Sequence, residues 1–202
     1  METPSPAHDG PSSDPRRTIL DRRRFVKTGA LGVLVFQVNG CAMPLTPGEA
    51  RARGADRQTF TAAEIATLDR LGETLLPGAA EKGFAQFIDH QCAGPHSECL
   101  SMIRYFDWPP PYGDFYKSGL AALDALSVAR LNASFADVEP AEATELVREI
   151  SAGQPDGWSG PPAPLFYLVT RSDAVDVVYG TVEGFEQLEV AYLAHIEPET
   201  KW

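Results

Sequence analysis

The side chains best suited to chemistry stand close together in the pattern His90-x-Cys92-x-x-x-His96-x-x-Cys99. Imidazole and thiolate groups bind zinc, but zinc sites usually space their ligands as C-x-x-C or H-x-x-x-H pairs, and His90 with Cys92 does not follow that spacing. Two cysteines in an oxidising compartment more commonly form a disulfide. The pattern therefore predicts no metal site and marks Cys92 and Cys99 as a candidate disulfide, either with each other or with a partner chain.

No other group of residues in the chain indicates catalysis. The sequence lacks a Gly-rich phosphate loop after a strand, a C-x-x-C-H motif for covalent c-type haem and a G-x-S-x-G nucleophile elbow. The pairs Glu145/Glu149 and Asp173/Asp176 have helical spacing, which is typical of solvated helix faces. We assign no catalytic, cofactor-binding or metal-binding residue, and we expect a binding or assembly role with no cofactor in this chain.

The net charge of the chain limits the classes of partner that it is expected to bind. The 202 residues carry a net charge of −11. Residues 1–40 hold six Lys/Arg and four Asp/Glu, so residues 41–202 hold 11 basic and 24 acidic side chains and have a net charge near −13. Such an acidic surface disfavours nucleic acid and anionic lipid as the main ligand. It suits a soluble or peripheral protein with a protein partner.

An export signal is predicted near the N-terminus. Arg22 and Arg23 begin the motif R-R-x-F-V-K, which includes Phe25 and Lys27, and an uncharged stretch follows over residues 28–41. A basic region before a modest apolar region is the layout of a secretory signal, and the paired arginines indicate the twin-arginine route. The apolar stretch is shorter than the roughly 20 residues that span a bilayer. We expect a periplasmic protein that is exported folded, and such a signal can also carry a bound partner.

The end of the signal has two readings. Val38-Asn39-Gly40-Cys41 resembles the lipobox of bacterial lipoproteins, which makes Cys41 a candidate for lipidation and for surface anchoring. The alternative is cleavage within the Ala-rich residues 49–55. We divide the chain into a disordered leader with the signal (residues 1–41), a linker (42–58) and a single domain (59–202).

The periodicity of apolar residues after position 59 is helical almost throughout. Thr61 and Glu64 form a capping box, and Pro77-Gly78 ends the helix that the box begins. Further helices are expected at about residues 84–93, 100–106, 114–131, 140–150, 165–178 and 185–190. The predicted fold is therefore all-α, an irregular bundle of about five to seven helices.

Aromatic residues and prolines concentrate between these helices, in residues 105–112 and 158–167. Rigid aromatic and proline residues lose little entropy on binding and make good anchors for a partner. Trp108, Trp158, Phe166 and Tyr167 are therefore candidates for a partner interface. The alternatives are that they cap the core of a small domain or form a sugar-binding platform.

Several short motifs, taken in order, resemble one family. They are Phe60-Thr61-Ala62-Ala63-Glu64 with Leu75-Leu76-Pro77, Phe87-Ile88-Asp89, the segment from Gly157-Trp158 to Arg171, and Val178-Tyr179-Gly180-Thr181-Val182-Glu183-Gly184-Phe185. Over about residues 60–198 the chain is similar to the small, gamma-type subunit (subunit 3) of gluconate 2-dehydrogenase and related flavin-dependent sugar or alcohol dehydrogenases.

The resemblance implies a non-catalytic subunit of an oxidoreductase complex. Its expected partner is a large FAD-containing dehydrogenase of the glucose-methanol-choline type, which it would help to assemble, escort through the twin-arginine translocase and in some cases anchor. A multihaem cytochrome c is a further expected partner. The alternative is a stand-alone periplasmic lipoprotein that binds a small molecule or an envelope component.

Overall fold

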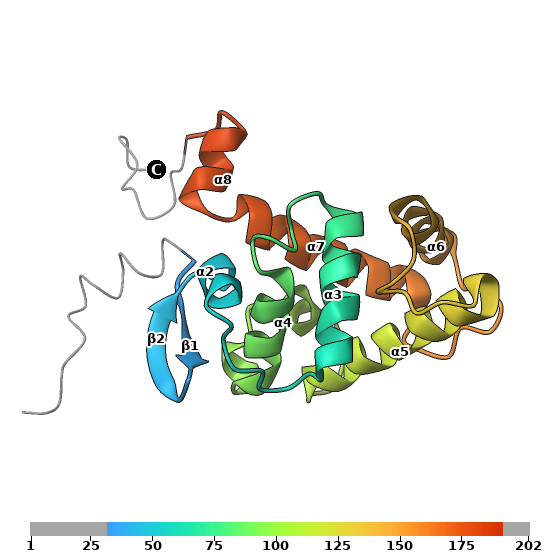
Figure 1. Ribbon diagram of the computed structural model, residues 1–202, viewed down its shortest axis with the longest axis horizontal. Coiled ribbons are helices and arrows are strands. Elements are labelled where there is room, and N and C mark those ends of the chain that lie inside the picture. Colours follow the sequence, from blue (N-terminus) through green and yellow to red (C-terminus); the bar gives the residue numbers. More distant parts are fainter. Residues whose placement is uncertain (1–31, 192–202) are drawn as a thin grey trace, which may run out of the picture.

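Helices account for most of residues 32–191, the part of the chain that the structure, a computed structural model, describes (Figure 1). The elements are β1 (Leu34–Val38), β2 (Cys41–Leu45), α2 (Pro47–Ala52), α3 (Ala62–Leu75), α4 (Phe84–Ala93), the 3-10 helices η1 (His96–Glu98) and η2 (Met102–Tyr105), α5 (Tyr112–Leu131), α6 (Pro140–Ala152), α7 (Ala163–Tyr179) and α8 (Val182–Gln187). The predicted fold class, an irregular all-α bundle, is confirmed.

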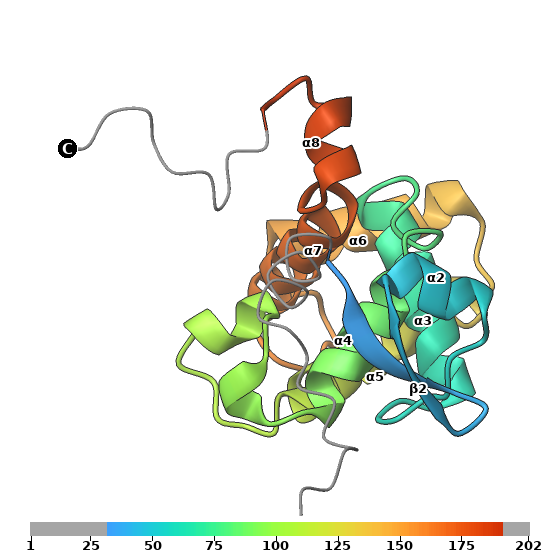
Figure 2. The same cartoon turned by 90° about the vertical axis from the view of Figure 1, so that its left-hand side faces the viewer.

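Helix α7 organises the core. It packs against α3, α4, α5 and α6, and α8 follows it at the end of the described chain (Figures 1 and 2). Phe166, Val169 and Ala174 of α7 are completely buried, as are Phe115 and Leu123 of α5. The buried residues of α7 recur at intervals of three and four, so they form one face of the helix, and that face includes the polar Thr170 and Asp173.

The predicted helices are found with small shifts in their ends. The capping box at the start of α3 is present, since Thr61 Oγ1 accepts a hydrogen bond from the Glu64 amide and the Glu64 carboxylate accepts one from the Thr61 amide. The helix expected at residues 100–106 is instead the short 3-10 helix η2. Pro109, Pro110 and Pro111 follow closely and do not continue a helix.

The expected linker at residues 42–58 is not a linker in the structure. It contains strand β2 and helix α2, and α2 begins with a second capping box formed by Thr46 and Glu49. Pro47 occupies the first turn, where its missing amide proton costs nothing. The pattern T-P-G-E therefore predicts the start of a helix, although the Gly, Ala and Arg content of residues 42–58 is typical of a linker.

A β-hairpin precedes α2. Strands β1 and β2 pair antiparallel, from Leu34 opposite Leu45 to Val38 opposite Cys41. Asn39 and Gly40 form the turn with φ angles of 51° and 76°. Two successive positive φ angles fit a two-residue hairpin turn, and Asn-Gly is the sequence that favours it. This turn explains Asn39, which is unusual within a lipobox.

The hairpin and α2 are attached to the helical bundle by close contacts. A Cβ atom on Gly83, at φ 83°, would lie 2.2 Å from the carbonyl carbon of Pro47, so only glycine allows α2 to approach the start of α4. Arg51 of α2 forms an ion pair with Asp69 of α3. Residues 34–52 are therefore part of the folded domain.

Asp89 of α4 fixes the entry to α3. Its carboxylate accepts hydrogen bonds from the backbone amides of Gln58 (2.8 Å), Thr59 (2.8 Å) and Phe60 (2.9 Å), and its side chain is buried. Three N–H donors satisfy the charge of a carboxylate that is withdrawn from water. The polar backbone before α3 is thus held against α4 by a single side chain.

We predict that Asp89→Ala lowers the free energy of unfolding by about 3 kcal/mol, because three backbone amides lose their acceptor, of which that of Phe60 is buried and the other two are partly buried. Asp89→Asn should cost less, since its one remaining oxygen can still accept from Thr59 and Phe60. Urea denaturation of both variants measures the difference. Equal losses below about 0.5 kcal/mol would contradict the role assigned to this carboxylate.

Candidate functional site

The predicted export motif lies outside the described residues, so Arg22, Arg23, Phe25 and Lys27 are not placed. The second half of the uncharged stretch that follows is placed. It forms β1 and the turn to β2, and Cys41 is the first residue of β2 with an exposed side chain. The candidate lipidation site is therefore next to a tight hairpin turn.

His90 of α4 contacts the hairpin. Its Nε2 lies 3.2 Å from the carbonyl oxygen of Val35, and its ring packs against Phe36 with 5.0 Å between the ring centroids. Burial lowers the pKa of His90, while the Val35 carbonyl and the neighbouring Asp89 oppose that shift. A neutral imidazole that donates from Nε2 fits this position, because the carbonyl can only accept.

Cys92 and Cys99 carry free thiols in the structure, so the candidate disulfide between them is not formed there, and a bond from either cysteine to a partner chain stays a prediction. Cys99 is buried, and Cys92 is half-buried at the end of α4. Burial raises the pKa of the Cys92 thiol strongly, and Cys99 and Asp173 raise it further. A thiol with so high a pKa is protonated at neutral pH and is a poor nucleophile and metal ligand.

A buried carboxyl group ties α7 to α5 and η2. Asp173 is completely buried, its carboxylate accepts a 2.6 Å hydrogen bond from the Tyr116 hydroxyl, and it accepts a second, of 2.7 Å, from the Met102 amide. Burial raises the pKa of Asp173 to about 7, although both hydrogen bonds act in the opposite direction. Sequence pattern does not reveal this site, because Asp173 and Asp176 have the spacing that is typical of a solvated helix face.

Two of the four predicted interface aromatics belong to the core. Phe166 is fully buried and packs against Phe115 and Trp158. Trp158 is 8% exposed, and its indole N–H donates a 2.6 Å hydrogen bond to the carbonyl of Pro161. For these two residues the core-capping alternative describes the structure, since neither ring is available to a partner.

The other two are half-buried, and the most exposed aromatic residue within residues 32–191 is a different one. Trp108 packs edge-on against Phe115, and Tyr167 packs against the hydrophobic core. Tyr105, at the end of η2, is 71% exposed, and the Arg104 guanidinium lies 5.6 Å from its ring centroid. With Leu100, which is 54% exposed, it marks the loop before α5 as an accessible apolar surface.

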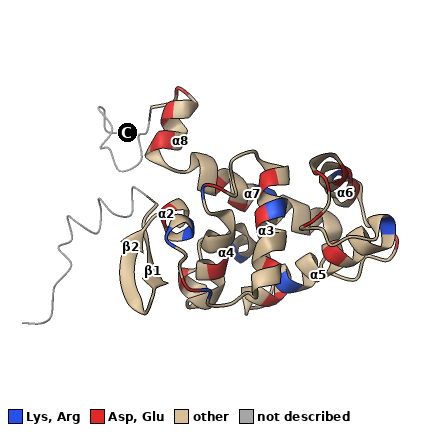
Figure 3. Cartoon of the chain, in the orientation of Figure 1, with Lys and Arg blue, Asp and Glu red and all other residues tan. Residues whose placement is uncertain are grey.

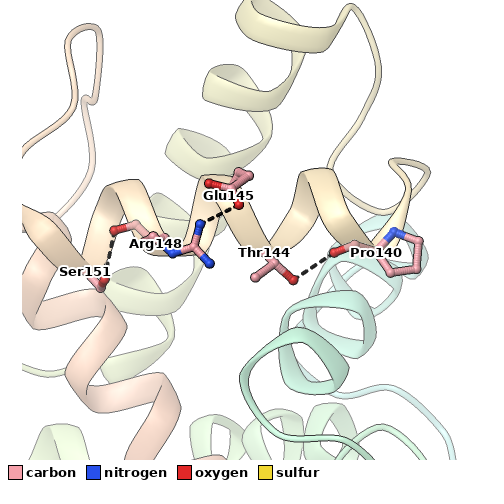
Figure 4. A network of polar contacts seen from close by, with 5 residues as sticks. All are labelled: Pro140, Thr144, Glu145, Arg148 and Ser151. Carbon is pink, nitrogen blue, oxygen red and sulfur yellow. Dashed lines mark hydrogen bonds and ion pairs between the residues drawn. The ribbon is translucent and has the colours of Figure 1, made fainter.

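Acidic side chains recur along α6 and α8 (Figure 3). On α6 they have partners within the chain. Glu145 pairs with Arg148, and Glu149 pairs with Arg130 of α5 at 2.7 Å. Thr144 and Ser151 donate to carbonyl groups of the same helix (Figure 4). The charged and polar side chains on this face of α6 therefore have their partners on α6 and α5, as expected for a solvated helix surface.

The described residues assemble no metal site and no membrane span. Within residues 32–191, no three His, Cys, Asp or Glu side chains are grouped so that they could hold a metal ion. None of the helices in this part of the chain is both long enough and apolar enough to cross a membrane.

These features define a small helical domain whose buried polar groups serve the fold. The model of the family described as gluconate 2-dehydrogenase subunit 3 matches residues 62–196, and the chain belongs to this family. The description denotes one subunit of a multi-subunit dehydrogenase, which confirms the resemblance drawn from the sequence motifs. Neither the curated proteins nor the solved structures contained a match to the chain.

We predict that Asp173 makes the protein less stable as the pH rises through neutrality. With a pKa near 7 when folded and 3.8 when unfolded, the group holds a proton only in the folded state between these values. Stability is then highest on the acid side and falls until the pH passes about 7. Between pH 5 and pH 8 the loss from this group should be about 3 kcal/mol.

Urea denaturation at the two pH values, compared with Asp173→Asn, isolates this contribution. The variant cannot titrate at position 173, whereas Asp176 and His90 are unchanged in both proteins. The difference in stability between pH 5 and pH 8 should therefore be smaller in the variant. Parallel pH dependences of the two proteins would contradict the prediction.

Proposed function

We propose that this chain is the non-catalytic small subunit of a dehydrogenase complex, which binds a large FAD-dependent subunit of the glucose-methanol-choline type and escorts it through the twin-arginine route. The observation that carries the proposal is the family match over residues 62–196 in a chain whose residues 22–27 read as a twin-arginine motif. Transport of folded cargo allows one signal to serve two bound chains.

The surface proposed to meet the large subunit is the loop from Leu100 to Trp108. It contains the exposed Leu100 and Tyr105, the Arg104 guanidinium beside the tyrosine ring and the half-buried Trp108. Tyr, Trp and Arg are the residues most enriched at the energetic centres of interfaces. The loop is also well supported, because the Met102 amide is bonded to the buried Asp173.

Cys41 is the candidate site for anchoring the protein at the membrane. The exposed side chain of Cys41 favours a second candidate, in which the chain is a periplasmic lipoprotein that stands alone and binds a small molecule or an envelope component. A lipidated Cys41 is also compatible with the complex, where it would hold the large subunit and a cytochrome c at the membrane. Palmitate labelling at Cys41 without a flavoprotein partner would favour the stand-alone protein.

We predict that replacing both Arg22 and Arg23 by lysine leaves the dehydrogenase activity of the large subunit in the cytoplasm, because the translocase no longer accepts the signal. Cell fractionation followed by a dye-linked activity assay measures the distribution. Arg16 and Arg17 form a second arginine pair in the leader and supply the matched control, since their replacement by lysine should leave export intact. Periplasmic activity in the Arg22/Arg23 variant would refute the escort function.

We predict that the double variant Leu100→Ala, Tyr105→Ala weakens binding of the large subunit by about 30-fold or more, as expected for loss of an anchoring tyrosine worth about 2 kcal/mol. Val128→Ala is the control, because Val128 is 48% exposed on α5 and lies outside the proposed surface. Co-purification of a flavin-containing polypeptide from the periplasm measures binding. Equal recovery with both variants would place the interface elsewhere.

A further inference from the structure

The segment after the arginine motif has two incompatible uses. As the apolar part of an export signal, residues 28–41 must be free to meet the translocase and the membrane. In the structure, residues 34–38 of the same segment form β1, in which Phe36 is 2% and Val38 is 8% exposed. The same apolar side chains cannot be buried in the domain and presented to the membrane at once.

Contacts from three separate elements hold β1 in place. Strand β2 pairs with it along its whole length, and Phe36, Val38 and Leu45 share an apolar cluster with Ala50 of α2. His90 of α4, in the helical bundle, contacts the Val35 carbonyl through Nε2, and its ring packs against that of Phe36 at a tilted angle.

The segment after α2 holds the end of the strand and the turn. The Asp56 amide donates a 2.8 Å hydrogen bond to the Gln37 carbonyl, and the Asp56 carboxylate accepts a 3.4 Å bond from the Gly40 amide. Figure 2 shows the hairpin beside α2 and in front of α4. The strand is therefore bonded to the domain from both its ends and its inner face.

We propose that β1 is the docked, export-silent form of the signal's apolar segment, and that its release from the domain controls export. The proposal rests on the twin-arginine function proposed above. In the folded precursor the docked and released forms compete, so the rate at which the translocase captures the chain follows the population of the released form. The same residues thereby delay export while β1 is docked on the folded domain and permit export of the folded domain once β1 is released.

Processing at Cys41 is subject to the same control. The bond before Cys41 follows a tight turn, in which Asn39 and Gly40 both have positive φ angles and Val38 pairs with Cys41. A protease that cleaves an extended signal segment cannot engage this turn while the strands are paired. Release of β1 therefore precedes cleavage, and cleavage would remove β1 and make the release irreversible.

The test weakens the contacts between the hairpin and the domain without changing any residue of the signal. His90→Ala removes the contacts to Val35 and Phe36, and Asp56→Ala removes the bond to Gly40. Each should raise the population of released β1 by about three- to tenfold, as expected for loss of one hydrogen bond and its packing. Arg148→Ala is the matched control, because Arg148 is exposed on α6, at the far end of the domain from the hairpin (Figures 1 and 4).

Two measurements are needed. Full-length precursor purified from cells without a twin-arginine translocase is treated briefly with chymotrypsin, and cleavage after Phe36 is followed by mass spectrometry. The wild type and Arg148→Ala should be protected there, and the two hairpin variants should be cut three- to tenfold faster. In pulse-chase export assays, the hairpin variants should reach the periplasm faster by a similar factor.

The outcomes separate this proposal from the proposed function. Slow cleavage after Phe36 in all four proteins, or faster cleavage with unchanged export kinetics, would overturn control by β1. Export that persists after lysine replaces Arg22 and Arg23 would instead overturn the twin-arginine function. Faster cleavage together with faster export in both hairpin variants, with the α6 control unchanged, supports the proposal.

Discussion

The arrangement of this domain depends on one turn of α4, in which Asp89 and His90 face different neighbours. The carboxylate of Asp89 binds three consecutive backbone amides before α3, and His90 binds the backbone of β1. A buried carboxylate is stable only when donors surround it, so the chain before α3 has little freedom to leave α4. The N-terminal hairpin and the first long helix therefore share one attachment point on the bundle.

A second buried carboxyl group, Asp173, connects helix α7 in the core to the surface loop. Through the Met102 amide it orients η2, and the exposed Tyr105 lies at the end of that short helix. The interface proposed for the large subunit is thus supported by a polar contact deep in the protein. Burial opposes ionisation of Asp173 and raises its pKa, whereas the hydrogen bonds from Tyr116 and Met102 favour the charged form.

The N-terminal elements lie in the sequence just before the segment that matches the family. The match covers residues 62–196, whereas β1, β2 and α2 lie before it, and α2 packs on its α4. Residues 34–52 therefore add a structural layer that the family model does not include. In the proposed function this layer begins with the apolar part of the export signal and packs on the domain that binds the partner, so docking of the signal can respond to the folded state of the domain.

The sequence alone determined the fold class, the starts and ends of most helices and the family, because helical periodicity, the Thr61–Glu64 capping box and proline stops act over a few residues. Only the tertiary structure decided the rest. Trp158 and Phe166 are core residues and Cys92 and Cys99 remain free thiols. The apolar segment before Cys41 forms a strand because it pairs with β2 and contacts His90 of α4. Composition does not predict that these parts of the chain meet. Burial and pairing depend on contacts between distant parts of the chain, and local sequence does not encode where those parts meet.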